Sequence, residues 1–185
     1  MANELTKVEA NLDGLNKLLK GLKSDYFVRV GIIGSQAGAK HKKTDLTNAE
    51  LGNIHEQPNN DGKKIPKRSF LEMPLKLKLN FKENEDTMKE IKKGFWKAFF
   101  IGSFNKDAAK QFYAQLGAKA LDIIIGAFET NGYGNWVPWS KAYERRRINK
   151  VKGKRKREQF WLNHNILTDT GQLRRSISFK VMKNK

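Results

Sequence analysis

The sequence contains no cysteine among its 185 residues. Disulfide bonds, thiolate-ligated zinc sites and cysteine nucleophiles are therefore excluded together. Long apolar runs are also missing, because none approaches the roughly 20 residues that a membrane-spanning helix needs. The first residues do not show a basic region followed by an apolar core, as a secretory signal would. We therefore expect a soluble protein with no membrane partner.

Recognisable catalytic motifs are lacking as well. His55-Glu56 could begin a zinc-protease motif, but Asn59 stands where the second histidine would be. Gly34 and Gly38 do not have the spacing of a phosphate-binding loop, and no nucleophile-elbow motif occurs. We expect no enzyme activity, no catalytic residue, no metal and no cofactor. A magnesium site built from carboxylates distant in sequence is left open, and with it the weaker alternative of a metal-dependent nuclease.

Acidic residues are scarce relative to basic ones. The chain has 37 lysines and arginines against 19 aspartates and glutamates, which gives a formal net charge of +18. Much of the excess is local, because residues 141–158 carry ten basic and two acidic side chains. A field of this size and clustering favours a polyanion or an acidic protein surface as partner.

The apolar pattern predicts an α+β fold. Hydrophobic residues make up 38% of the chain, enough for one domain of this length, and we expect a single domain over 1–185. Period-2 patterns predict strands at 26–33 and about 176–182, and a broad apolar stripe predicts a long helix over 107–129 capped by Asp107. We expect an antiparallel sheet packed against this helix, with an N-terminal helix at 4–23 and helical insertions around it.

Several local signals refine this outline. Thr47 and Glu50 have the spacing of a capping box, which predicts a short helix over 48–57. Asp169 or Thr170 could cap another short helix, with Gln172 completing a capping box at Asp169, and we expect Asp169 to pair locally with Arg174 or Arg175. Residues 34–45 read as a flexible basic loop. The inward face of the first strand is either the set that begins with Tyr26 or the alternate set.

Four motifs occur in a fixed order along the chain. They are an A-x-x-x-x-x-H-E helix ending at His55-Glu56, the I-P-x-R-x-F-L segment 65–71, a Gly-rich turn into W-x-P at 132–138, and L-T-D-T-G-x-L-x-x-S-I at 167–177. In this order and spacing the set resembles the tailed-phage virion-morphogenesis family, from about Val28 to Ile177. The segments 78–105 and 145–160 are enlarged relative to the family pattern.

The resemblance implies a non-enzymatic virion protein, synthesised in the host cytoplasm, that forms a ring at the head–tail junction. It would complete the neck or the tail top around the DNA path, next to portal or adaptor proteins and tail proteins. The alternative is a sequence-independent nucleic-acid-binding protein unrelated to virions.

The candidate contact residues follow from charge and from aromatic content. Residues 141–158 read as a basic arm, and its segment 145–157 reads either as phosphate-contacting or as solvated and facing water or an acidic partner. No base-reading helix is evident, so any contact with packaged double-stranded DNA would be through phosphates. Trp136 is expected in the core, and Trp139 is the candidate for a subunit interface. The candidate DNA- or partner-facing residues are Lys40, Lys42, Lys43, Arg145, Arg146, Arg147, Lys152, Lys154, Arg155, Lys156, Arg157, Arg174 and Arg175.

Overall fold

The computed structural model describes residues 26–42, 44–57, 65–79, 85–101, 106–153, 155–158 and 165–183. The predicted N-terminal helix at 4–23 lies outside these ranges. In chain order the elements are β1 (Tyr26–Ile32), α2 (Ser35–Gly38), α3 (Asn48–Glu56), α4 (Glu72–Lys78), α5 (Glu85–Ile101), α6 (Lys106–Glu129), α7 (Lys141–Asn149), α9 (Gln172–Arg175) and β2 (Ile177–Lys183).

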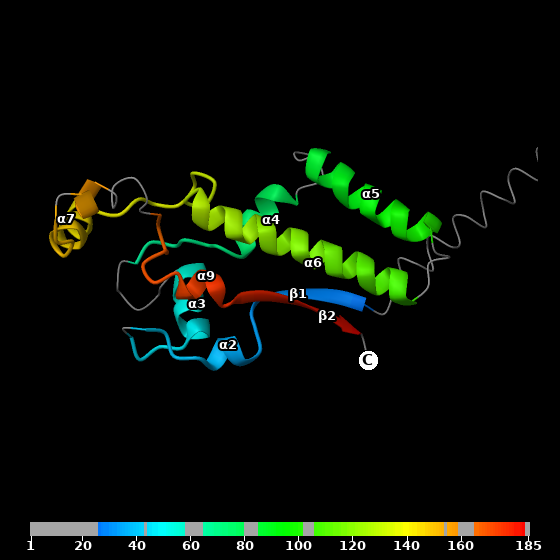
Figure 1. Cartoon of the computed structure of the whole chain (residues 1–185), viewed down its shortest axis with the longest axis horizontal. Helices are drawn as coiled ribbons and strands as arrows, with labels where there is room; N and C mark the ends of the chain where they lie inside the picture. Colours follow the sequence, from blue (N-terminus) through cyan, green and yellow to red (C-terminus); the bar gives the residue numbers. More distant parts are fainter. Residues whose placement is uncertain are drawn as a thin grey trace, which may run out of the picture.

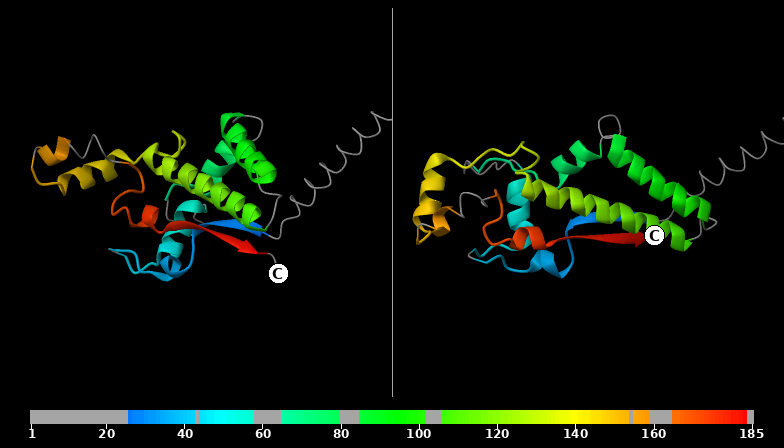
Figure 2. Two further views of the ribbon diagram at one scale, coloured as in Figure 1. Left: turned by 45° about the vertical axis from the view of Figure 1, so that its right-hand side comes forward. Right: turned by 45° about the horizontal axis from the view of Figure 1, so that its top comes forward.

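The predicted α+β architecture is confirmed. β1 and β2 pair in antiparallel register, with Tyr26 opposite Lys183 and Ile32 opposite Ile177. Helix α6 covers one face of this two-stranded sheet, and α5 packs on α6 from the other side, so the layers are sheet, α6 and α5 (Figure 1). The turned views in Figure 2 show the same layering, with α7 standing off beyond the end of α6.

The sheet face that meets α6 is the set beginning with Tyr26. The Tyr26 and Tyr113 rings lie 6.4 Å apart, and Val30 and Ile32 pack against the buried core. Opposite them on β2, Phe179 lies against the backbone of α6 at Gly117, where a β-carbon would overlap the ring. Glycine at this position therefore allows the strand and the helix to approach closely.

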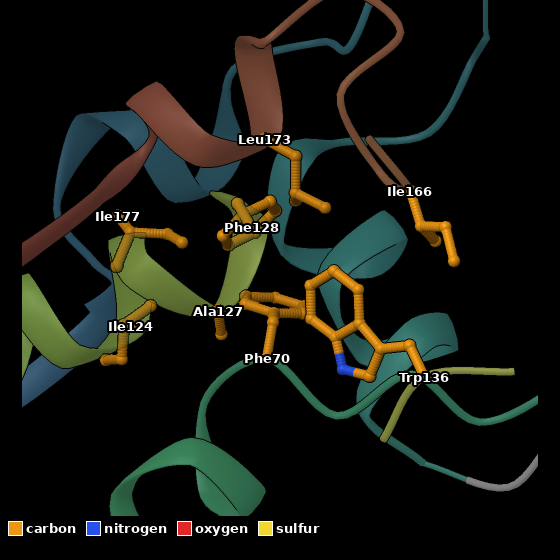
Figure 3. Packing of buried hydrophobic residues seen from close by; sticks show 8 residues of the cluster. All are labelled: Phe70, Ile124, Ala127, Phe128, Trp136, Ile166, Leu173 and Ile177. Atoms are coloured by element: carbon orange, nitrogen blue, oxygen red, sulfur yellow. The ribbon is translucent and has the colours of Figure 1, made fainter. Parts of the chain in front are cut away.

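The core lies at the C-terminal end of α6. The Phe128 ring packs at a tilt of 56° against Phe70 (5.4 Å between ring centres) and makes a T-shaped contact with Trp136 (5.6 Å). Trp136 is therefore a core residue, as predicted, and only 5% of it is exposed. The buried cluster in Figure 3 comprises Phe70, Ile124, Ala127, Phe128, Trp136, Ile166, Leu173 and Ile177.

Three local predictions are wrong. Residues 34–45 are not a loop throughout, because α2 forms a helical turn and Lys40 bridges Thr47 as an isolated antiparallel pair. The capping box at Asp169 does not form, because α9 begins after Gly171 and the Gln172 side chain bonds elsewhere; the alternative, Thr170, does accept from the Gln172 amide through Oγ1 (3.2 Å). Helix α6 begins one residue before Asp107, which therefore lies inside the helix.

The basic arm is partly helical. Its first half is α7, whose N-cap Ser140 accepts a hydrogen bond from the Tyr143 amide (3.3 Å). A further helical turn covers residues 155–158. Arg145, Arg146 and Arg147 are thus presented from a helix, and Arg155, Lys156 and Arg157 from a short helical turn.

Candidate functional site: a cationic groove

The four motif segments meet around one groove. Helix α3 and the segment 65–68 form one side, residues 137–140 with α7 form another, and residues 167–173 close it. We call this hollow of about 860 Å³ the cationic groove, since the described residues of its lining include Lys42, Arg68, Arg146 and Arg147 against one carboxylate, that of Asp169. In Figure 1, α3 and α9 lie below the C-terminal end of α6, and α7 stands farther out at the same end of the molecule.

Glu56, from the first motif, holds the backbone of the second. Its Oε1 accepts from Ser69 Oγ (2.6 Å) and from the Glu72 amide (2.9 Å). Its Oε2 accepts from the amides of Phe70 (2.9 Å) and Leu71 (3.1 Å). These amides precede or begin α4, so Glu56 acts as a cap supplied by another helix and stabilises the helix N-terminus by charge as well.

Arg68 joins the second motif to the third. Its Nε donates to the Val137 carbonyl (3.0 Å) and its Nη2 to the Pro138 carbonyl at the long distance of 3.5 Å. The residue is only 8% exposed, and burial lowers the pKa of its guanidinium. Among the described residues no carboxylate forms an ion pair with Arg68. Arg68 is therefore a buried cation whose recorded partners are two neutral carbonyl groups.

His55 lines the same groove. Its Nδ1 is the one buried side-chain nitrogen or oxygen in the described part of the chain that has no hydrogen-bond partner. Burial is the largest cause that lowers the pKa of His55, to about 4, and the charges of Arg68 and His41 lower it further. The imidazole is therefore neutral at pH 7.

This lowered pKa makes stability depend on pH. In the unfolded chain His55 takes up a proton near its ordinary pKa of about 6.5, whereas the folded protein resists protonation down to about pH 4. The free energy of unfolding should therefore decrease as the pH is lowered from about 6.5 to about 4, by up to about 3 kcal/mol. Urea titrations of the wild type and His55→Gln from pH 7 to pH 4 test this, because the variant should lose that part of the slope. Parallel curves would contradict it.

His41, Asn48 and Gln172 connect α3 to the last motif. His41 bonds Asn48 Oδ1 through Nδ1 (3.0 Å) and Thr170 Oγ1 through Nε2 (3.3 Å). The Gln172 side chain accepts from the Lys42 amide (2.9 Å) and donates to the Lys40 carbonyl (2.8 Å) and to Asn48 Oδ1 (3.1 Å). Gln172 thus holds the segment around Lys40 onto α9 instead of capping its own helix.

The Arg147 side chain contacts other residues of the chain and does not extend freely into solvent. Its Nη2 lies 2.7 Å from Asp169 Oδ1, and its guanidinium carbon lies 5.2 Å from the centre of the Trp139 ring. Trp139 in turn meets Tyr143 edge-on at 5.3 Å. The predicted pairing of Asp169 with Arg174 or Arg175 is therefore wrong, and the ion pair instead ties α7 to the last motif.

The remaining candidate residues divide by exposure. Arg174 is paired with Glu129 (2.7 Å), and Arg175 donates to the Thr170 carbonyl (3.0 Å). Trp139 is half-buried against the core, and its role in a subunit interface stays a prediction. Lys43 and Lys154 lie outside the described residues. The side chains exposed to solvent include Lys40, Lys42, Arg145, Arg146, Lys152, Arg155, Lys156 and Arg157.

Sequence reasoning missed Arg68 and His55 as groove residues. A signal for Arg68 was available, since an arginine flanked by Ile65-Pro66 and Phe70-Leu71 stands in an apolar setting where burial is to be expected. Within the described ranges no group of three or more His, Asp or Glu side chains could hold a metal ion. No helix described there has the length and apolarity to cross a bilayer.

The cationic groove is a positively charged hollow whose shape could accommodate a ligand. Its polar groups are held by hydrogen bonds from several elements, and its walls carry aromatic and aliphatic side chains. Comparisons of the chain with protein-family models, with curated proteins and with solved structures find no match.

Proposed function

We propose that the chain is a structural, ring-forming virion protein of a tailed-phage head–tail junction, completing the neck or tail top around the DNA path. The observation that carries this proposal is the convergence of the four motif segments. They are far apart in the sequence, yet they are joined by Glu56 to 69–72, by Arg68 to 137–138 and by Gln172 to Asn48 at the start of α3. The resemblance to the tailed-phage virion-morphogenesis family rests on the order and spacing of these four motifs. Contacts among the motifs in the fold support it.

The exposed basic residues of the arm support the placement of the protein around the DNA path. Arg145 and Arg146 on α7, and Arg155 and Lys156 on the turn that follows, are exposed. Helix α7 stands away from the layered core, where it can reach a neighbouring molecule (Figure 2). In a ring this basic surface would face the DNA path or an adaptor protein, and it would bind phosphates without reading bases.

Native mass measurement with negative-stain imaging of the purified protein tests ring formation. The proposal expects a closed ring, either alone or after addition of a portal or adaptor protein of the same virion. A monomer or dimer that binds DNA tightly and forms no ring with such a partner would instead favour the alternative, a nucleic-acid-binding protein unrelated to virions.

The basic surface makes a separate prediction on duplex DNA. Replacing Arg145, Arg146, Arg155 and Lys156 with glutamine should weaken binding and reduce the slope of log K against log salt by about 0.9 for each phosphate that is no longer neutralised. The matched control removes the same charge from exposed positions on α5 and α6, as Lys89→Gln, Lys92→Gln, Lys93→Gln and Lys110→Gln. Equal weakening in the two variants would show that net charge, and not this surface, governs binding.

A further inference from the structure

Exposed apolar side chains gather at the rim of the cationic groove. Four large hydrophobic residues are exposed in the described part of the chain, and three of them line this groove: Ile65 (37%), Val137 (52%) and Tyr143 (40%). Below them the lining continues with Leu51, Leu167 and Leu173. Exposed apolar residues concentrated at one concave site, with a polar surround, are typical of a binding surface.

The charge inside the groove is not balanced. Among the described residues that line it, Asp169 is the one carboxylate, and Asp169 is already engaged by Arg147. Arg68 lies deeper and is buried, with its guanidinium bound to two carbonyl oxygens. Arginine is rarely fully buried without a paired anion, because desolvating the charge costs several kcal/mol. The site therefore favours a ligand that brings a negative charge to Arg68.

A second, independent polar group lies in the same groove. The Nδ1 atom of His55 is buried and has no partner, although buried polar atoms are almost always hydrogen-bonded. Its neighbour Arg68 donates its backbone amide to the His55 carbonyl (2.9 Å), so the two side chains come from adjoining pieces of backbone. The lining thus holds, beside Arg68, a second side chain with a buried polar atom whose hydrogen-bonding capacity is not satisfied.

We propose that the cationic groove binds an extended acidic segment of a partner protein. A carboxylate of that segment pairs with the Arg68 guanidinium, and an apolar side chain next to it packs on Ile65 and Val137. A hollow of about 860 Å³ has room for a few side chains. A bidentate arginine–carboxylate pair would give the contact its geometry, and the apolar rim would contribute most of the buried area.

An acidic peptide fits this groove better than duplex DNA does. Arg68 is 8% exposed, whereas Val137 (52%) and Ile65 (37%) of the same lining are open to solvent, and a single extended chain is narrow enough to insert a side chain toward it. The phosphates of a duplex lie on a wide, stiff rod, which suits the exposed cations of α7 instead. The inference concerns the groove alone and holds whether or not the protein forms a ring.

The test uses the full-length protein and two fluorescein-labelled peptides, a repeating Asp-Leu peptide and the matching Asn-Leu peptide, followed by fluorescence anisotropy. The Asp-Leu peptide should bind at least tenfold more tightly than the Asn-Leu peptide. Val137→Asp, which places a like charge at the exposed rim, should weaken Asp-Leu binding at least tenfold. Gln111→Asp, the same charge change at an exposed position on α6, should leave it unchanged. Arg68→Met should remove the preference for Asp-Leu, and Val137→Asp keeps the test decisive if that buried variant does not fold.

Three outcomes would overturn the proposal. Equal binding of the two peptides would show that the groove does not select a carboxylate. Direct binding of a labelled 20-base-pair duplex that Val137→Asp weakens at least tenfold, and that Gln111→Asp leaves unchanged, would make the groove a phosphate site. Self-association of the wild type that Val137→Asp abolishes, measured by sedimentation, would make a second copy of the chain the occupant.

Discussion

Replacing Glu56 with alanine is expected to lower the free energy of unfolding by about 3 kcal/mol, because several hydrogen bonds to one carboxylate are removed together. Three backbone amides and the Ser69 hydroxyl converge on Glu56, and Ser69 and Phe70 are buried. A donor that is left buried without a partner costs more than the hydrogen bond itself contributes. The turn that carries Phe70 into the core would lose all four of these hydrogen bonds to α3 and keep the one from the Arg68 amide to the His55 carbonyl.

Chemical denaturation monitored by tryptophan fluorescence measures this effect, since Trp136 packs against the same turn. Glu56→Gln should fall between the wild type and Glu56→Ala, because the amide keeps one acceptor oxygen but loses the charge. Glu50→Ala is the control: Glu50 closes the capping box with Thr47 on the same helix, and its loss should cost about 1 kcal/mol. A loss of stability at Glu56 no greater than that at Glu50 would contradict the assigned role.

Gly132→Ala should also destabilise the protein by about 3 kcal/mol, through left-handed backbone strain and overpacking together. Gly132 has a φ of 71° in the turn that ends α6. A β-carbon there would overlap the indole ring of Trp136, which is held in place by its Nε1–H donating to the Ser69 carbonyl (2.9 Å). The ring cannot move without disturbing its packing on Phe128 in the core.

Gly134 provides the matched control for this substitution. Its φ is 80°, but a β-carbon there meets nothing within 4 Å. Gly134→Ala therefore isolates the backbone strain, about 1–2 kcal/mol, and the difference between the two variants measures the clash with Trp136. Thermal unfolding of both proteins gives the comparison. Equal destabilisation would show that the indole ring adapts to the added methyl group.

The parts of the fold that sequence could predict are those set by local chemistry. The Thr47–Glu50 capping box forms with both of its hydrogen bonds, and the Ser140 N-cap begins α7. The apolar stripe correctly placed α6, and the alternation after Ser176 correctly placed β2. In each case the partners lie within a few residues of one another, so spacing alone determines the contact.

The candidate site could not be predicted in the same way because its contacts join distant segments. Gln172 has the correct spacing to cap with Asp169, yet its side chain bonds Lys40, Lys42 and Asn48, more than 100 residues earlier. Asp169 pairs with Arg147 on α7, not with its neighbours Arg174 and Arg175. Where a polar side chain has several possible hydrogen-bond partners, the tertiary fold determines which one it bonds. The spacing of residues in the sequence does not contain that information.

The pairing of β1 with β2 has a consequence for the order of folding. β1 is the first element of the described part of the chain and β2 is the last. The sheet therefore pairs two segments that have all the other described elements between them in the sequence. Closing so large a loop costs chain entropy before any strand contact stabilises it, whereas α5 and α6 are neighbours in sequence. We therefore expect the helical pair to assemble early and the sheet to close late, after Ile177–Lys183 has left the ribosome. Before β2 pairs, β1 has no strand partner within the described chain, and the face of α6 that packs on the sheet is only partly covered.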